Sequence, residues 1–180
     1  MATSSPKVSE LKRYLASRSQ AELVQDIAEL FKRIPAVKDY YQVKLNPQAE
    51  DDVADRYKVI IRREFATDFV PGPGRLAIAR KAVMDFKKVA SSAAGVADMM
   101  LFYVEQGVAY TTAFGDIDEP FYNSLESMYK QAAQWVTRQH LQEVFLPRFQ
   151  RILTDTEPMG WGFHDVLREM YQEFFAGMDG

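Results

Sequence analysis

The chain of 180 residues contains no cysteine and only two histidines. The absence of cysteine excludes disulfide bonds, thiolate metal ligands and a cysteine nucleophile, and it is typical of proteins in the reducing cytosol. The N-terminal residues are polar and do not form the pattern of a secretory signal. We therefore expect a cytoplasmic protein that folds without covalent cross-links or a structural metal.

No stretch of the sequence has the length and apolar character of a membrane span. The longest apolar segment, residues 96–114, is interrupted by Asp98 and Glu105, whereas a spanning helix needs about 20 predominantly apolar residues. With 47% hydrophobic and 26% charged residues, the composition is that of an ordinary globular protein. The segment is predicted to be a buried core helix, and we expect no membrane partner.

Apolar residues recur at helical spacing from one end of the chain to the other. Phe121, Leu125, Met128, Ala132 and Trp135 follow one another at intervals of 4, 3, 4 and 3 residues, which places them on one face of a helix. About eight or nine segments show this period, and no turn between alternating residues indicates a strand pair. The sequence predicts an all-α protein, either a compact multi-helix assembly or a short stacked-helix array.

Local signals mark where several of these helices begin. Ser19 and Glu22 form a capping-box pattern, Asp118 precedes Glu119-Pro120 as a cap, and Asn46-Pro47 is typical of a helix start. Residues 67–74 hold two prolines and two glycines and are expected to form a loop. The length favours one domain over residues 1–180. The alternative is a division into basic N-terminal helices (1–70) and a helical core with an acidic C-terminal part (75–180).

Charge is distributed unevenly between the two halves of the sequence. Residues 1–90 hold 17 Lys and Arg against 12 Asp and Glu, and residues 91–180 hold 5 against 13, which gives net charges of +5 and −8. A protein with such a separation attracts different partners at its two ends. The pattern predicts a basic surface that meets an acidic protein or the acidic half of a second copy.

Within the basic half, a glycine-containing loop leads into a helix that carries several cations. Free N–H groups at a helix start attract anions, and glycine allows a ligand to approach the backbone. No strand precedes this loop, and neither a P-loop nor a dinucleotide fingerprint is present. A linker followed by a solvated basic face is therefore the favoured interpretation. The candidate residues for binding an anion or an acidic partner are Arg75, Arg80, Lys81, Lys87 and Lys88.

Residues 7–31 are similar in apolar spacing to the SAP motif, a small helix-turn-helix module that binds DNA. The segment has Ser17-Arg18-Ser19 where that module has a glycine-bearing turn. Through Arg33 it also carries only 6 basic against 4 acidic residues, whereas duplex binders use a dense basic surface. An ordinary helical hairpin is favoured here, and nucleic acid is not an expected partner.

The segment Gly160–Asp165 (GWGFHD) carries the candidate for acid/base chemistry. His164 can titrate near neutral pH, and a histidine beside a carboxylate can act as a general base. Adjacent residues point to different sides of a helix, so Asp165 is not expected to orient His164. The favoured interpretation is structural: Trp161 and Phe163 anchor the last helix, while Asp165 complements its dipole.

No complete metal-ligand set is present, so no metal or cofactor is predicted. His140 and Glu143 are spaced three residues apart, but the histidine precedes the glutamate, the reverse of the order that helical di-metal sites use. The acidic run Asp116–Glu119 lacks the spaced ligands and glycine of a calcium loop. A structural role is favoured for both groups.

Six short segments spread along the chain form a recognisable set. They are Lys44-Leu45-Asn46-Pro47, Ala79-Arg80-Lys81-Ala82-Val83, Asp85-Phe86-Lys87-Lys88, Tyr103-Val104-Glu105, Gly115-Asp116-Ile117 and Gly160-Trp161-Gly162-Phe163-His164-Asp165. Through these segments the chain resembles, over most of its length, an uncharacterised bacterial all-α family of unknown function. The resemblance implies a small bacterial-type protein and assigns no activity, cofactor or catalytic residue.

Three functional hypotheses follow from these observations. The first is a non-catalytic binding or scaffolding protein that uses its segregated basic and acidic surfaces to bind either an acidic protein or a second copy of itself. The second is a small enzyme acting on an anionic substrate, with Arg75 and Arg80 holding the anion and His164 moving a proton, which requires these residues to share one pocket. The third is weak nucleic-acid binding through residues 7–33.

Overall fold

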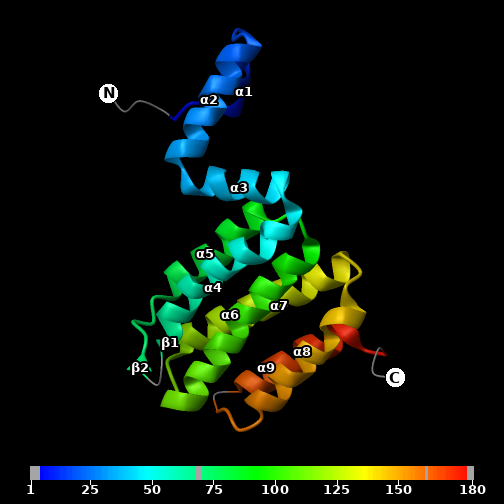
Figure 1. Cartoon of the computed structure of the whole chain (residues 1–180). Coiled ribbons are helices and arrows are strands. Elements are labelled where there is room, and N and C mark those ends of the chain that lie inside the picture. Colours follow the sequence, from blue (N-terminus) through cyan, green and yellow to red (C-terminus); the bar gives the residue numbers. More distant parts are fainter. Residues whose placement is uncertain (1–4, 68–69, 161, 178–180) are drawn as a thin grey trace.

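The computed structural model describes residues 5–67, 70–160 and 162–177, and these residues are almost entirely helical (Figure 1). The all-α prediction is confirmed, with nine α-helices in the described ranges. In chain order the elements are α1 (Val8–Ala16), α2 (Gln20–Arg33), α3 (Pro35–Leu45), the 3-10 turn η1 (Pro47–Ala49), α4 (Glu50–Phe65), β1 (Ala66–Thr67), β2 (Val70–Pro71), α5 (Leu76–Val89), α6 (Ala93–Phe114), α7 (Glu119–Arg138), α8 (Gln142–Thr156) and α9 (Phe163–Phe175).

The local start signals at Ser19 and Asp118 are confirmed. The backbone N–H of Ser19 donates to the Glu22 carboxylate (2.8 Å), and the N–H of Glu22 donates to the Ser19 hydroxyl (3.3 Å). Asp118 accepts a hydrogen bond from the N–H of Phe121 (3.0 Å). The start at Asn46-Pro47 differs, because Pro47 opens the single turn η1 and α4 begins three residues later at Glu50.

A short antiparallel strand pair, β1 with β2, lies in the segment that was expected to be a loop. The backbone N–H of Gly72, directly after β2, donates to the carbonyl of Phe65, directly before β1 (2.7 Å). This hydrogen bond holds the chain in place where it leaves the strand pair. A Cβ atom at position 72 would lie 2.6 Å from the carbonyl oxygen of Glu64, so the close approach requires glycine. Strands of two residues are too short for an alternating pattern to be visible in the sequence.

Helices α4–α9 form what we call the body, with α6 in contact with α4, α5, α7 and α8. Its core is rich in aromatic rings. Phe65 packs edge-on against Tyr103 with ring centres 5.3 Å apart, and Phe149 lies between Tyr129 (5.1 Å) and Phe175 (4.9 Å). Because rings of this size each remove a large apolar area from water, they account for much of the stability of the body.

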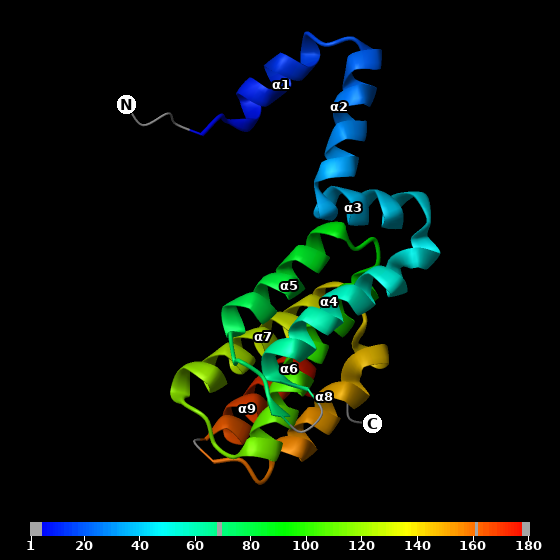
Figure 2. The same cartoon turned by 60° about the vertical axis from the view of Figure 1, so that its left-hand side comes forward.

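The first two helices stand apart from the body. We call α1, α2 and the following residue Ile34 the arm (residues 8–34). Helix α3 joins the arm to the body, since it contacts α2 on one side and α4 and α5 on the other. Figures 1 and 2 show the arm projecting beyond α3, and Figure 2 shows α1 and α2 diverging from the turn between them. Among the residues of α1 and α2, all of which the structure describes, none is buried.

Candidate functional site

Two of the predicted anion-binding residues are held by neighbouring helices. Arg75 donates two hydrogen bonds to the carboxylate of Glu64, both 2.9 Å. Arg80 donates to the carbonyl of Ser124 (2.8 Å), and its guanidinium lies 6.0 Å from the centre of the Tyr103 ring. Both guanidinium groups therefore link elements of the body to one another.

The three predicted lysines also have partners within α5 and α7. Lys81 and Lys88 both pair with Asp85, and their hydrogen bonds hold the pKa of this carboxyl below its usual range. The ammonium of Lys87 lies 4.4 Å from the centre of the Trp135 ring. The structure thus brings Lys81 and Lys88 together on one carboxylate and gives Lys87 a separate contact. Anion binding by this group stays a prediction.

His164 lies at the start of α9, half-buried, with its Nδ1 atom 3.2 Å from the hydroxyl of Thr156. Asp165 pairs with Arg168 (2.7 Å) instead. Phe163 is fully buried against Tyr122, as an anchor of the helix should be. Trp161, the other expected anchor, lies outside the described residues.

The enzyme hypothesis needs Arg80 and His164 in one pocket. Arg80 contacts α6 and α7, and His164 contacts α8. Two cavities of about 770 and 550 Å³ are lined by neither residue.

Among the described side chains, no group of three or more His, Asp or Glu could hold a metal ion. His140 lies exposed in the turn after α7, with a left-handed backbone (φ 56°).

A buried carboxylate, Glu50, lies beside the smaller cavity. Glu50 accepts hydrogen bonds from the backbone N–H groups of Ser91 (2.9 Å) and Ser92 (3.1 Å), just before α6. A Cβ atom at Gly95 would lie 2.5 Å from the carboxylate, so glycine leaves room for it. Since it satisfies these N–H groups, Glu50 has a structural role.

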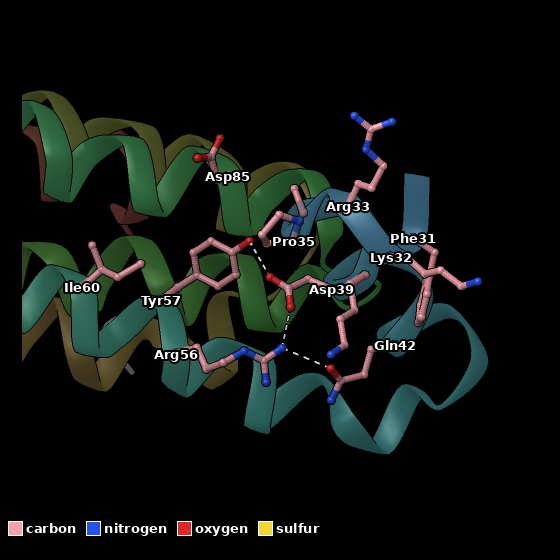
Figure 3. Close-up of a pocket in the computed structure, with 12 residues that line it drawn as sticks. Phe31, Lys32, Arg33, Pro35, Asp39, Gln42, Arg56, Tyr57, Ile60 and Asp85 are labelled. Atoms are coloured by element: carbon pink, nitrogen blue, oxygen red, sulfur yellow. Dashed lines mark hydrogen bonds and ion pairs between the residues drawn. The ribbon is translucent and has the colours of Figure 1, made fainter. Parts of the chain in front are cut away.

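The larger cavity lies where the arm meets the body, between α3, α4 and α5 (Figure 3). At its floor Asp39 accepts a hydrogen bond from the hydroxyl of Tyr57 (3.0 Å) and pairs with Arg56. Burial, together with Asp39, raises the pKa of the Tyr57 hydroxyl. Lys32 and Arg33, at the end of α2, lie on its rim. The floor is an internally paired polar cluster that fixes α3 on α4.

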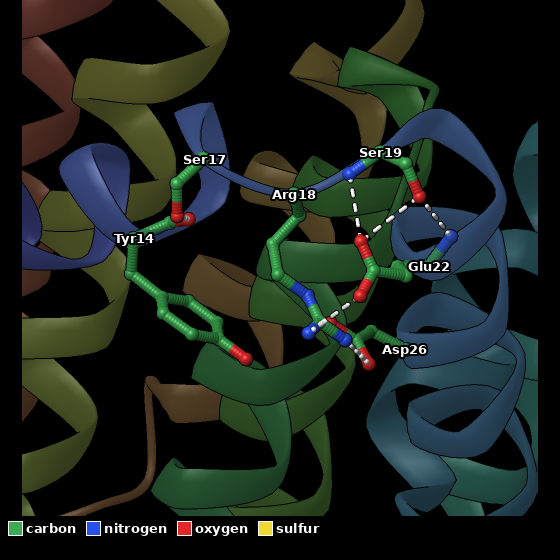
Figure 4. A network of polar contacts seen from close by, with 6 residues as sticks. All are labelled: Tyr14, Ser17, Arg18, Ser19, Glu22 and Asp26. Atoms are coloured by element: carbon green, nitrogen blue, oxygen red, sulfur yellow. Dashed lines mark hydrogen bonds and ion pairs between the residues drawn. The ribbon is translucent and has the colours of Figure 1, made fainter.

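The turn between α1 and α2 is held by one side chain (Figure 4). Arg18 pairs with Glu22 (3.0 Å) and Asp26 (3.4 Å) of α2, and its guanidinium lies 5.5 Å from the centre of the Tyr14 ring of α1. The N–H and hydroxyl of Ser19 and the charge of Arg18 hold the pKa of Glu22 below its usual range. These contacts define the turn and leave the apolar sides of both helices uncovered.

The apolar side of the arm is its most unusual feature. Ile27 and Leu30 of α2 are 43% and 50% exposed, although a helix of this pattern normally turns such residues toward a core. Large apolar side chains gathered on one exposed element of a protein favour an interaction site there. The large hydrophobic side chains that the arm exposes are Val8, Leu11, Tyr14, Val24, Ile27, Leu30 and Ile34.

Residues 7–33 thus form two helices joined by a turn, but without the packed interior expected of a helical hairpin. Two of the carboxylates in this segment, Glu22 and Asp26, pair with Arg18 at the turn. Sequence periodicity identified the apolar residues of this segment correctly. It gave no sign that they would remain exposed, because the spacing is the same for a buried and for an uncovered face.

Taken together, the fold and this surface define an all-α protein with a helical body and a projecting amphipathic arm. The chain belongs to DUF6155, a family of unknown function whose model matches residues 7–175. The match includes the arm as well as the body. No curated protein and no solved structure matches the chain. Among the described residues, no helix has the length and apolar character needed to cross a membrane.

Proposed function

We propose that this protein is a non-catalytic binding protein whose docking element is the arm. The observation that carries the proposal is the exposure of the apolar side of α1 and α2 in a chain whose other long helices bury theirs. The family match extends over the arm, which supports a role shared by the family rather than an appendage of one sequence.

The length of the arm helices supports the same proposal. Helices α1 and α2 have 9 and 14 residues, and isolated helices shorter than about 12–15 residues are marginal in water. Most helical stability in proteins comes from packing of an amphipathic face. A partner that covers the apolar side would therefore stabilise the arm as it binds. The unequal charge of the two halves of the chain would orient that partner.

Site-specific photo-cross-linking in cells that naturally produce the protein tests this proposal. A photoreactive amino acid is placed at Val24 in the arm and, as a matched control, at Val144 in α8, since these valines are 62% and 65% exposed. We expect a discrete protein adduct from position 24 and none from position 144. Equal labelling of the two positions, or no adduct from position 24, would contradict the proposal.

A further inference from the structure

We infer that the partner of the arm is a second copy of this chain, bound with the two α2 helices antiparallel. This inference rests on the proposed function and specifies the partner. Two exposed apolar residues of α2, Ile27 and Leu30, and the charges beside them support it.

Two exposed apolar residues lie one turn apart in the second half of α2. Ile27 and Leu30 are 43% and 50% exposed, whereas Leu23 is half-buried and Ile34 follows the helix with an extended backbone. In an antiparallel pair centred between these two residues, Ile27 of each copy would meet Leu30 of the other. Apolar side chains of helices that pair side by side interlock in such layers. The same surface on both copies forms the contact, as two-fold symmetry requires.

The charges beside Ile27 and Leu30 are complementary for the same orientation. Asp26 and Arg33 are seven residues apart, close to two helical turns, so they lie along the same edge of α2. Antiparallel pairing brings like edges together, so Asp26 of each copy would face Arg33 of the other. Arg33 is exposed, and the side chain of Asp26 is 38% exposed. A parallel pair would place Asp26 opposite the edge that carries Phe31, without an ion pair.

The charge of the arm disfavours an anionic membrane and duplex nucleic acid as its partner. The arm carries 5 basic and 4 acidic side chains. Helices that lie on anionic membranes have Lys and Arg on the polar face, and duplex nucleic acid needs a dense basic surface. A polar face of mixed sign suits a protein surface of mixed sign, and a second copy provides one.

Sedimentation velocity of the full chain is the first test, with Ile27→Glu in the arm and Val144→Glu in the body. We expect the wild type and Val144→Glu to form dimers at micromolar concentrations. Ile27→Glu should weaken dimerisation by about 100-fold or more, since it places a charge in both symmetric contacts. Because Ile27 is not part of the core, unchanged thermal unfolding of the body controls for folding.

A charge exchange tests the antiparallel orientation. Asp26→Arg and Arg33→Asp should each weaken dimerisation by about 5- to 30-fold, because two ion pairs are replaced by two like-charge contacts. The double variant should recover to within about threefold of the wild type. Asp26→Arg also removes a contact of Arg18. That loss is present in the double variant too, so recovery reports the Asp26–Arg33 contact.

The outcomes separate this inference from the proposed function. A chain that stays monomeric while position 24 cross-links to another protein in cells would overturn the second-copy inference and leave the arm as a docking element. A dimer unaffected by Ile27→Glu would overturn the inference by placing the contact elsewhere. Additive loss in the double charge variant would overturn the antiparallel orientation.

Discussion

Helices α2 and α7 have similar apolar patterns and opposite surroundings. In α7, Leu125 and Met128 are fully buried against the rest of the body, whereas in α2, Ile27 and Leu30 remain about half exposed. Both helices form because their residues favour a helix with one apolar side. Periodicity therefore determines the helix and the direction of its apolar side, whereas the tertiary arrangement determines whether anything covers that side.

A core substitution in the body should destabilise the protein far more than a substitution in the arm. Phe149→Ala removes a fully buried ring that packs against Tyr129 and Phe175. We expect the free energy of unfolding to fall by about 3–5 kcal/mol, because the substitution leaves a cavity. Ile27→Ala in the arm, measured on the monomer, should change it by less than about 0.5 kcal/mol.

Chemical denaturation monitored by circular dichroism measures both variants. Tryptophan fluorescence provides a second probe, with Trp135 lying half-buried in the body. If Ile27→Ala lowered the free energy of unfolding as much as Phe149→Ala, the arm would be part of the same packed core as the body. That result would contradict the difference between α2 and α7.

An intermediate effect is expected at the carboxylate that joins α4 to α6. Glu50→Ala leaves the backbone N–H groups of Ser91 and Ser92 without this acceptor. We expect a loss of about 2–3 kcal/mol in the free energy of unfolding, as for a buried hydrogen bond to a charged group. The matched control is Asp55→Ala, an exposed carboxylate on the same helix. Its effect should stay within about 0.5 kcal/mol, and equal effects of the two substitutions would contradict the capping role of Glu50.

The smallest effect is expected in the arm and depends on pH. The pKa of Glu22 is lowered by the N–H and hydroxyl of Ser19 and by Arg18. A carboxyl whose pKa is lower in the folded state stabilises that state above its unfolded pKa of about 4.3, and this contribution disappears as the pH falls through the folded value. We therefore expect the first turn of α2 to lose hydrogen-exchange protection as the pH falls below this value. The body should keep its protection down to a lower pH.

Glu22→Gln provides the matched control, because an amide of nearly the same shape does not titrate in this range. Its α2 protection should be lower than that of the wild type at neutral pH and should show less change between neutral and acidic pH. The same steep pH response in this variant would show that Glu22 is not the group responsible.

Much of the fold could be predicted because its signals are local. The Ser19–Glu22 and Asp118 caps, and the apolar stripe of α7, depend on residues within one or two turns of each other. The β1–β2 pair could not be predicted, because two residues per strand give no periodic signal. The role of Glu50 could not be predicted for a different reason, since its partners Ser91 and Ser92 are about forty residues away in the sequence.

The candidate site was only partly accessible from the sequence. The charge asymmetry drew attention to Arg75 and Arg80, but the structure pairs the first with Glu64 and places the second against Tyr103 and Ser124. A count of charges does not reveal such pairings, because the partners come from different helices. The apolar residues of the arm were identified, whereas their exposure depends on where α3 directs the chain.

Hydrogen exchange measured by mass spectrometry at several protein concentrations shows whether a second copy covers the arm. If the two α2 helices pair, the protection of α2 should increase with concentration while that of the body stays constant, and Ile27→Glu should abolish the increase. Protection of α2 that is the same at every concentration, in both the wild type and Ile27→Glu, would contradict the pairing.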